Sequence, residues 1–336
     1  DPILGHRIGP DTAGHDSLGF RNPRVPVQAD VVVLGDSQTY GFGAAREGSW
    51  PQQLAGLLGG PVYSMALGGY GPMEYLYLMR NPAKKLQSKQ FVVGFYFGND
   101  LMDACYAVEG RTHWAGWRSS PAVACASASS FAGGATPTKR LGAWRDWLAG
   151  HSVLYGVLKA TVLRRLATWE KDQAAAQVTQ DVQMLWKDPA QPATRTIFMP
   201  QQRLAVVDPE SPGVQEGLRI TKRAFEEMRD EAATQRARLL VVMIPTKERV
   251  YCAYLARSGA ELPPAYARLC EAEERVAAEL TRHLTASAIT YTDALPALRE
   301  QTMVHAQIYP TDAEGHPLPV GYSVIASVVF AAMRSP

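Results

Sequence analysis

The sequence predicts a parallel α/β fold whose central sheet is covered by helices on both faces. Five apolar runs that end in glycine or polar residues alternate with segments of helical period along most of the chain. Continuous apolar runs are typical of strands that are buried on both sides. Strands that alternate with helices favour a parallel sheet between helical layers. With 336 residues, the chain is long enough for one large α/β domain or two smaller ones.

The expected elements follow from the apolar spacing. The strands are expected at 30–34, 61–65, 90–97, 237–244 and 288–292. The helices are expected near 48–58, 72–80, 214–236, 248–257, 264–285, 296–301 and 319–333. Residues 1–29 are rich in Gly, Pro, Asp and Arg and have no apolar period, so we expect an extended lead-in that lies across the domain.

The alternation of strands and helices stops between residues 101 and 213. This segment contains a Ser/Ala/Gly-rich loop at 119–136, a helical stretch near 139–178 and a proline-punctuated stretch at 188–212. A segment of this length without the main rhythm predicts an inserted subdomain or a lid. The expected organisation is the lead-in 1–29 and one domain, 30–336, which a large, mainly helical insertion at 101–213 interrupts after the third strand.

Charge, hydropathy and metal-ligand spacing exclude several classes of protein. The net charge is +2 and no long basic run occurs, so nothing indicates a nucleic-acid partner. No apolar run approaches the ~20 residues that span a bilayer. The chain begins at Asp1 without a start methionine or an apolar leader, so any signal or anchor is expected outside this sequence. No His/Cys cluster has the spacing of metal ligands, and we expect neither a metal nor a cofactor.

The four cysteines form two pairs that are close in sequence. Four cysteines allow three connectivities, and the simplest is the local one, Cys105–Cys125 with Cys252–Cys270. Four unrelated buried thiols are the alternative. The pairing pattern favours disulfides, which indicate an oxidising compartment such as a periplasm or the cell exterior.

A strand-to-helix turn presents Ser37 directly after the first apolar run. The run breaks at Gly35, and Asp36 and Ser37 follow before the next helical segment. A hydroxyl at the carboxyl end of a buried strand, close to a helix N-terminus, is well placed to act as a nucleophile. On this stretch alone, a helix-capping serine in an ordinary loop is the alternative.

The carboxyl ends of parallel strands meet at one edge of the sheet, where the sites of open α/β sheets form. The residues expected at this edge are Ser37, Gly69, Asn99 and Lys247 after the first four strands, and Asp312, Glu314 and His316 after the fifth. They supply a nucleophile, a base, an acid and hydrogen-bond donors. A chance collection of polar loop residues is the alternative, and the convergence of these types at one edge favours a hydrolytic centre.

Each of these residues has a role in ester chemistry. Serine needs a neighbouring base to take its proton, and His316 is the candidate. A carboxylate must orient the imidazole, and both Asp312 and Glu314 are near enough in sequence.

Negative charge that develops on an attacked carbonyl oxygen needs fixed donors. The expected oxyanion hole consists of the backbone N–H groups of Ser37 and Gly69 and the side-chain amide of Asn99. Glycine at position 69 allows a close approach of the backbone, because it has no Cβ.

Three further residues are candidates for substrate binding. Lys247 could bind an acidic substrate group, or be a surface lysine in a turn. Trp114 and Trp117, in the tryptophan-rich insertion, could stack on sugar rings, or pack the subdomain. A basic amphipathic stretch at 139–165 suits a membrane surface or an anionic polysaccharide, although a core-packed helix with a solvated basic face is the commoner arrangement.

Four ordered blocks at the strand ends resemble those of the SGNH hydrolase superfamily, the GDSL-like esterases. The blocks are Gly35-Asp36-Ser37 with Thr39 and Gly41; Gly69; Gly98-Asn99-Asp100; and Asp312 to His316 followed by Pro317, Gly321 and Tyr322. The resemblance covers roughly 30–100 and 237–333. It implies a flavodoxin-like three-layer α/β/α fold with a Ser–His–Asp hydrolytic centre.

Two positions depart from the family pattern. Ser64 stands where the second block usually has asparagine. The carboxylate lies four residues before His316 at Asp312, or two before it at Glu314, whereas three is usual. Asp312 has the usual residue type and Glu314 has one methylene more, so Asp312 is slightly preferred.

The layout also resembles secreted or periplasmic SGNH proteins associated with bacterial exopolysaccharide machinery. This implies a serine esterase that removes acetyl groups from a carbohydrate, or an O-acetyltransferase that uses a sugar hydroxyl in place of water. A non-catalytic carbohydrate-binding or scaffold module is the alternative of another class. The implied partners are an acylated carbohydrate or polysaccharide and membrane-associated polysaccharide machinery, and the implied location is periplasmic or secreted.

Overall fold

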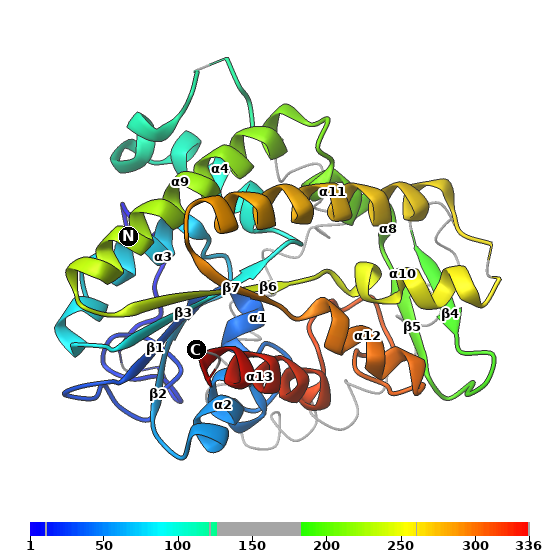
Figure 1. Ribbon diagram of the computed structural model, residues 1–336, viewed down its shortest axis with the longest axis horizontal. Coiled ribbons are helices and arrows are strands. Elements are labelled where there is room, and N and C mark those ends of the chain that lie inside the picture. Colours follow the sequence, from blue (N-terminus) through cyan, green and yellow to red (C-terminus); the bar gives the residue numbers. More distant parts are fainter. Residues whose placement is uncertain (11, 121, 126–182, 260, 335–336) are drawn as a thin grey trace, which may run out of the picture. The chain divides into compact units, whose positions relative to one another are not determined.

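A five-stranded parallel sheet is the centre of the computed structural model (Figure 1). Its strands are β1 (Val31–Gly35), β2 (Val62–Ala66), β3 (Gln90–Tyr96), β6 (Arg238–Ile244) and β7 (Thr290–Asp293). They lie in the order β2-β1-β3-β6-β7, and all neighbouring pairs are parallel. Counted along the chain, this is the 2-1-3-4-5 order of flavodoxin-like folds. The predicted fold class is confirmed.

The structure describes residues 1–10, 12–120, 122–125, 183–259 and 261–334. Asp1–Cys125 and Met184–Pro336 form one compact unit, the first of the two into which the chain divides. The first unit contains the flanks of the predicted insertion, 101–125 and 184–213. The predicted helical stretch near 139–178 lies outside the described residues.

Helices cover both faces of the sheet (Figure 1). On one face lie α3 (Pro72–Arg80), α4 (Asp100–Gly110), α9 (Pro212–Thr234) and α11 (Pro264–Ala286); on the other lie α2 (Trp50–Leu58), α12 (Leu295–Met303) and α13 (Pro319–Arg334). Successive side chains of a strand point to opposite faces. Accordingly, Val32 and Leu34 of β1 join the first core, whereas Val33 joins the core that contains Trp50 and Leu54. Burial on both faces explains why β1 is apolar throughout.

Regular elements also occur where the sequence shows no clear period. They are α4, the antiparallel hairpin of β4 (Met184–Lys187) and β5 (Arg195–Phe198), α8 (Pro200–Val207), and short 3₁₀ helices at Arg46–Gly48, Ala83–Leu86 and Thr112–Trp117. The period of α4 is obscured because Asp100, in its first turn, is buried with the apolar residues. α4 packs closely on α9, where a Cβ on Gly217 would lie 2.0 Å from the backbone oxygen of Leu101.

The lead-in 1–29 lies against β2, the edge strand of the sheet. Asn22 Nδ2 donates to the Ser64 carbonyl (2.8 Å), and the Ser64 N–H donates to Asn22 Oδ1 (3.1 Å). The Tyr63 hydroxyl donates to Asp16 Oδ2 at 2.8 Å, and both residues are buried. A side-chain amide therefore satisfies backbone groups that an edge strand would otherwise leave unpaired.

Both predicted disulfides are present. Cys105–Cys125 joins α4 to the segment that follows the 3₁₀ helix Thr112–Trp117, and Cys252–Cys270 joins α10 (Lys247–Arg257) to α11. Disulfides form and persist in oxidising environments, so this finding supports an extracytoplasmic location.

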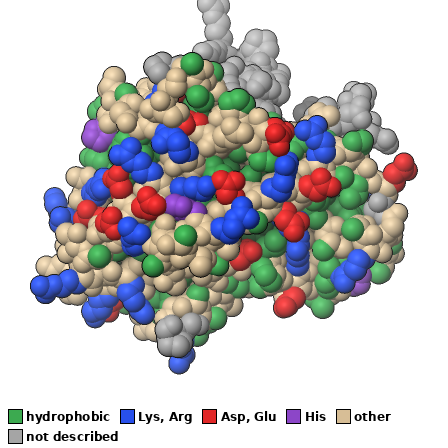
Figure 2. Space-filling model, turned by 45° about the horizontal axis from the view of Figure 1, so that its top comes forward, with side chains coloured by type: hydrophobic (Ala, Val, Ile, Leu, Met, Phe, Trp, Pro, Cys, Tyr) green, Lys and Arg blue, Asp and Glu red, His purple; other side chains and the backbone are tan. Residues whose placement is uncertain are grey.

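The face turned forward in Figure 2 carries cationic and anionic side chains side by side. Ion pairs of the helical layer include Arg80 with Glu227 (2.7 Å) and Lys222 with Glu279 (2.5 Å). Because pairs in contact with water contribute only about 0–1 kcal/mol each, the two apolar cores contribute most of the stability. None of the described helices is long and apolar enough to cross a membrane.

Candidate active site

The turn after β1 brings the Ser37 side chain to the carboxyl edge of the sheet. Helix α1 (Ser37–Tyr40) begins immediately after the turn, and the Asp36 carboxylate caps it by accepting a hydrogen bond from Gln38 N at 2.8 Å. The turn needs glycine at position 35, because a Cβ there would lie 2.1 Å from Thr39 Oγ1. The cap is therefore Asp36 and not the serine, which leaves the Ser37 hydroxyl available.

Ser37, His316 and Glu314 form a continuous chain of contacts. His316 Nε2 lies 2.8 Å from Ser37 Oγ, and His316 Nδ1 lies 2.5 Å from Glu314 Oε1. A carboxylate only accepts hydrogen bonds, so Nδ1 carries the proton and Nε2 is free to accept the serine hydroxyl proton. The hydrogen bond from His316 lowers the pKa of Glu314 to about 2, so this carboxylate is charged at neutral pH. This arrangement fits a nucleophile, its general base and the group that orients the base.

The contacts correct the slight preference for Asp312 as the orienting carboxylate. Asp312 Oδ1 instead accepts a hydrogen bond from the backbone N–H of Glu314 at 3.0 Å, which closes the turn before His316. From only two residues away, the longer Glu314 side chain reaches back to the imidazole, and it also accepts from His316 N at 3.2 Å. The extra methylene, which counted against Glu314 in the sequence, allows the contact.

Two of the three predicted oxyanion donors are open. Within the described residues, the backbone N–H groups of Ser37 and Gly69 donate to no acceptor. The Gly68–Gly69 loop lies against the nucleophile, because a Cβ on Gly68 would be 3.5 Å from Ser37 Cβ. Gly69 has φ +78°, a conformation that other residues rarely adopt.

The third predicted donor, Asn99, contacts a neighbouring carboxyl group. Its Nδ2 donates to Asp103 Oδ2 at 2.6 Å, and its side chain also lowers the pKa of the nearby Asp36 carboxyl. Together with Asp100, these form a cluster of three carboxyl groups beside the serine turn, in which Asp36 and Asp100 are buried and Asp103 is half-buried. Burial raises the pKa of Asp36 to about 6 and that of Asp103 to about 7, and it raises the pKa of Asp100 well above its usual range. Asn99 therefore contributes one of its two Nδ2 hydrogens to the carboxyl cluster, and its role as an oxyanion donor stays a prediction.

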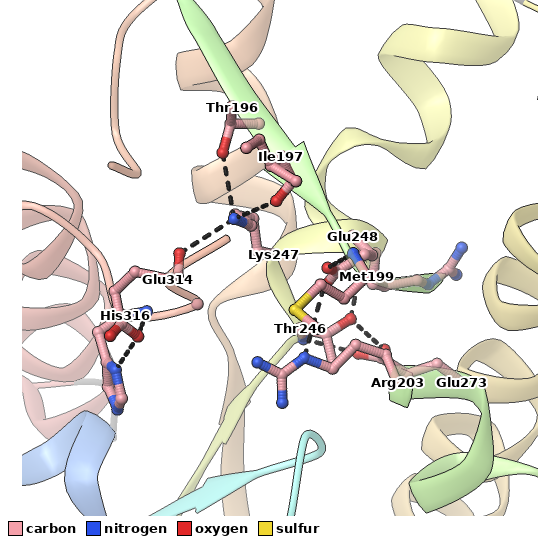
Figure 3. Close-up of polar contacts among 12 residues, drawn as sticks. Thr196, Ile197, Met199, Arg203, Thr246, Lys247, Glu248, Glu273, Glu314 and His316 are labelled. Carbon is pink, nitrogen blue, oxygen red and sulfur yellow. Dashed lines mark hydrogen bonds and ion pairs between the residues drawn. The ribbon is translucent and has the colours of Figure 1, made fainter. Parts of the chain in front are cut away.

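Lys247 is a buried support of the acid–base loop, so the prediction that it binds a substrate group is wrong. Its Nζ carries three N–H donors and lies within hydrogen-bond distance of four acceptors, which are Ile197 O (2.7 Å), Glu314 O (3.0 Å), Thr196 Oγ1 (3.1 Å) and Asp312 O (3.1 Å). Figure 3 shows this ammonium between β5 and the loop that carries Glu314 and His316. Its burial lowers the pKa of Lys247 to about 8.

The two tryptophans take up packing positions. Trp114 is buried, with 4% of its surface exposed, and its Nε1 donates to the Ile3 carbonyl at 3.3 Å. The Arg223 guanidinium covers the ring of Trp117 at 4.0 Å. A buried indole cannot stack on a sugar ring, so the prediction is wrong for Trp114, and packing is the alternative that describes both residues.

Arg203 is a residue near the site that the sequence did not indicate, because it lies on α8, where no period was recognised. Its Nη2 approaches Gly315, between the acid and the base, so closely that a Cβ there would lie 2.7 Å away. Its Nε lies 3.8 Å from Glu248 Oε2, and Figure 3 draws both side chains. The described part of the chain contains no set of three or more His, Cys, Asp or Glu that could hold a metal ion.

Comparisons with known proteins give structural likeness only. No family model matches the chain, and no curated protein matches it. Similar solved structures include the acetylxylan esterase Axe2 from Geobacillus stearothermophilus (9% identity, 93% of this chain and 98% of that chain, TM-score 0.43). They also include a member of the lipolytic protein G-D-S-L family from Veillonella parvula DSM 2008 (10%, 91% and 98%, 0.43) and a GDSL-like lipase from Bacteroides thetaiotaomicron VPI-5482 (10%, 90% and 86%, 0.38).

At these identities and scores, the likeness carries no argument about the activity of this chain. The resemblance to the SGNH superfamily therefore rests on the four sequence blocks, on the sheet order and on the contacts of Ser37.

The first prediction separates the two carboxylates. Glu314→Gln should lower kcat/KM for an acetyl ester by at least about 100-fold, because an orienting carboxylate is worth up to about 10⁴ in rate. Asp312→Asn keeps an acceptor for the Glu314 N–H and should cost less than about tenfold. Steady-state kinetics on both variants checks this, and equal losses would mean that Glu314 does not orient His316.

The second prediction concerns Lys247. Lys247→Met leaves buried acceptors unpaired, which costs about 1–3 kcal/mol for each, and it releases the acid–base loop. The free energy of unfolding should fall, and kcat/KM should drop about tenfold or more for neutral and anionic esters alike. Urea denaturation and kinetics on a matched pair of esters measure both effects. A loss confined to the anionic ester would restore the substrate-binding role.

The third prediction uses the carboxyl cluster. Because burial raises the pKa of Asp103 from 3.8 to about 7, the folded state binds more protons than the unfolded state between about pH 4 and 7. This group therefore contributes stability at low pH that is lost as the pH rises, at about 1.4 kcal/mol per pKa unit. Asp103→Asn should raise the free energy of unfolding relative to wild type more at pH 7.5 than at pH 4.5. Urea titrations that give the same difference at both pH values would contradict it.

Proposed function

We propose that the chain is a serine ester hydrolase of the SGNH type that acts through an acyl-enzyme on Ser37. The observation that carries the proposal is the unbroken path from Ser37 Oγ through the His316 imidazole to Glu314 Oε1, with contacts of 2.8 and 2.5 Å. Two open backbone N–H groups beside the nucleophile complete the set that acyl transfer needs. A module that only binds carbohydrate has no need for this path.

In the first half of the reaction, Ser37 Oγ attacks the ester carbonyl while His316 Nε2 takes the hydroxyl proton. The carbonyl oxygen becomes an oxyanion, which accepts hydrogen bonds from the N–H groups of Ser37 and Gly69. The intermediate then collapses, the bond to the alcohol breaks, and His316 returns the proton to the departing alcohol oxygen. Ser37 is left as an ester of the acyl group.

In the second half, His316 takes a proton from water, which attacks the acyl-enzyme. The bond to Ser37 Oγ then breaks, His316 returns the proton to Oγ, and the acid is released. Glu314 keeps its negative charge throughout, because the pKa of its carboxyl is held near 2. The charge stabilises the imidazolium that forms in each half and holds the ring with Nε2 toward the serine.

The finer parts of the proposal concern the substrate. The sequence resemblance implies that the substrate carries an acetyl group on a carbohydrate. It also implies a location in the periplasm or outside the cell, together with polysaccharide machinery. The two disulfides support the oxidising location. If a sugar hydroxyl replaces water in the second half, the same residues make the protein an O-acetyltransferase.

The test compares wild type with Ser37→Ala on 4-nitrophenyl acetate and on a fluorophosphonate probe. Wild type should release nitrophenol and become labelled, and Ser37→Ala should do neither. Ser327→Ala, which changes an exposed hydroxyl on α13, is the matched control and should behave as wild type. Addition of oligosaccharide with mass detection of acetylated product distinguishes transfer from hydrolysis. A wild type that neither turns over nor labels would exclude both enzymatic functions.

A further inference from the structure

We propose that His6 is a positioning residue for the oxyanion hole, which holds the Gly68–Gly69 peptide so that the Gly69 N–H points into the site. The inference rests on the proposed function and deepens it. His6 Nε2 lies 2.8 Å from the Gly68 carbonyl oxygen. A carbonyl oxygen only accepts hydrogen bonds, so Nε2–H of the imidazole is the donor.

The stereochemistry of the peptide links this contact to the oxyanion hole. The Gly68 carbonyl and the Gly69 N–H belong to one planar unit, and the described chain has no cis peptide. In a trans peptide these two groups point in opposite directions. Because His6 holds the carbonyl on its own side, the N–H is turned to the opposite side, and the structure leaves it open there.

The loop could otherwise adopt a second orientation. The turn from Leu67 to Tyr70 is closed by a hydrogen bond from Tyr70 N to Leu67 O at 3.2 Å, and Gly69, its third residue, has φ +78°. This is the φ of a type II turn, whereas a type I turn has about −90° at this position. The two types differ by roughly a half-turn of the central peptide, and glycine at both central positions permits either one. The hydrogen bond from His6 therefore selects the orientation that directs the N–H away from it.

His6 itself is held in place. The Tyr70 hydroxyl donates to the His6 carbonyl at 3.0 Å, and the two rings lie 5.2 Å apart. Arg111 Nη1 and Trp114 Nε1 donate to the carbonyl of Ile3 at 3.0 and 3.3 Å. This gives the buried Trp114 a function, because it anchors the lead-in segment that carries His6.

The same anchor also reaches the far end of the glycine-rich loop. Arg111 forms an ion pair with Glu74, whose Oε2 accepts a hydrogen bond from the Gly71 N–H at 2.9 Å. The carbonyl of Gly68 and the amide of Gly71 are thus fixed through the lead-in and through α3, respectively. The loop is held in its central peptide and at its far end, and a preorganised donor requires such fixed positions.

The test uses three substitutions at position 6 that differ in whether the side chain can still donate a hydrogen bond to the Gly68 carbonyl. In His6→Gln, the amide Nε2 occupies about the place of the imidazole Nε2 and can still donate to Gly68; His6→Asn is one bond too short, and His6→Ala has no donor. Removal of an oxyanion donor itself costs about 10²–10³ in kcat. Release of the peptide should cost less, so we expect kcat to fall about tenfold in His6→Ala and His6→Asn, with KM nearly unchanged and with recovery in His6→Gln.

A boronic acid that adds to Ser37 places an oxygen in the oxyanion hole without turnover. Its affinity should fall by the same factor as kcat in His6→Ala and recover in His6→Gln. His283→Ala, at a histidine of α11 whose side chain contacts Lys222 and Glu226, is the matched control and should leave both quantities unchanged.

Three results would overturn the proposal: no change in His6→Ala, equal losses in His6→Ala and His6→Gln, or a loss confined to KM. Failure of the proposed function gives a different result, because wild type would then bind no boronic acid and hydrolyse no ester.

Discussion

The position of the acid and the base depends on one buried ammonium group. Lys247 Nζ lies within hydrogen-bond distance of the carbonyls of Asp312 and Glu314 on one side and of Thr196 and Ile197 of β5 on the other. An unpaired buried cation costs several kcal/mol, so the hairpin, the acid–base loop and the end of β6 must come together for any of them to be stable. Lys247 therefore fixes the acid–base loop through its backbone carbonyls. This keeps His316 within hydrogen-bond distance of Ser37.

The other half of the site is supported by the lead-in. Besides the contact of His6 with the glycine loop, Arg21 donates to the carbonyls of Tyr40, Gly41 and Ala44 at 3.3, 3.2 and 2.9 Å. These carbonyls lie at and beyond the end of α1, where the helix dipole favours a cation. Nucleophile and oxyanion donors are thus fixed by one segment without regular structure, whereas the base is fixed by Lys247.

The sequence could predict what depends on strand periods, and much less of what depends on loop paths. Buried strands and the strand-end rule were enough to bring Ser37 to the same edge as the acid–base loop. Glu314, and not Asp312, orients the base because a backbone N–H donates to the Asp312 carboxylate. No rule of sequence spacing predicts that hydrogen bond. The burial of Lys247 depends on a hairpin that has no recognisable period. Asn99 lies where its sequence block predicts, at the end of the third strand of the sheet. The contact of its side chain with Asp103 depends on carboxyl groups that meet only in the folded chain.

These carboxyl groups make fixed oxyanion donors more important. Asp36 Oδ2 lies 3.5 Å from Ser37 Oγ, and its carboxyl, with a pKa near 6, is mostly charged at pH 7. A negative charge at this distance disfavours the formation of an oxyanion nearby, by an amount that grows as the local dielectric falls. Mobile water or a flipping peptide would respond to that charge by reorienting. Donors whose direction is set by His6 and by the cap of α1 cannot reorient, so they meet the oxyanion despite the acidic cluster beneath it.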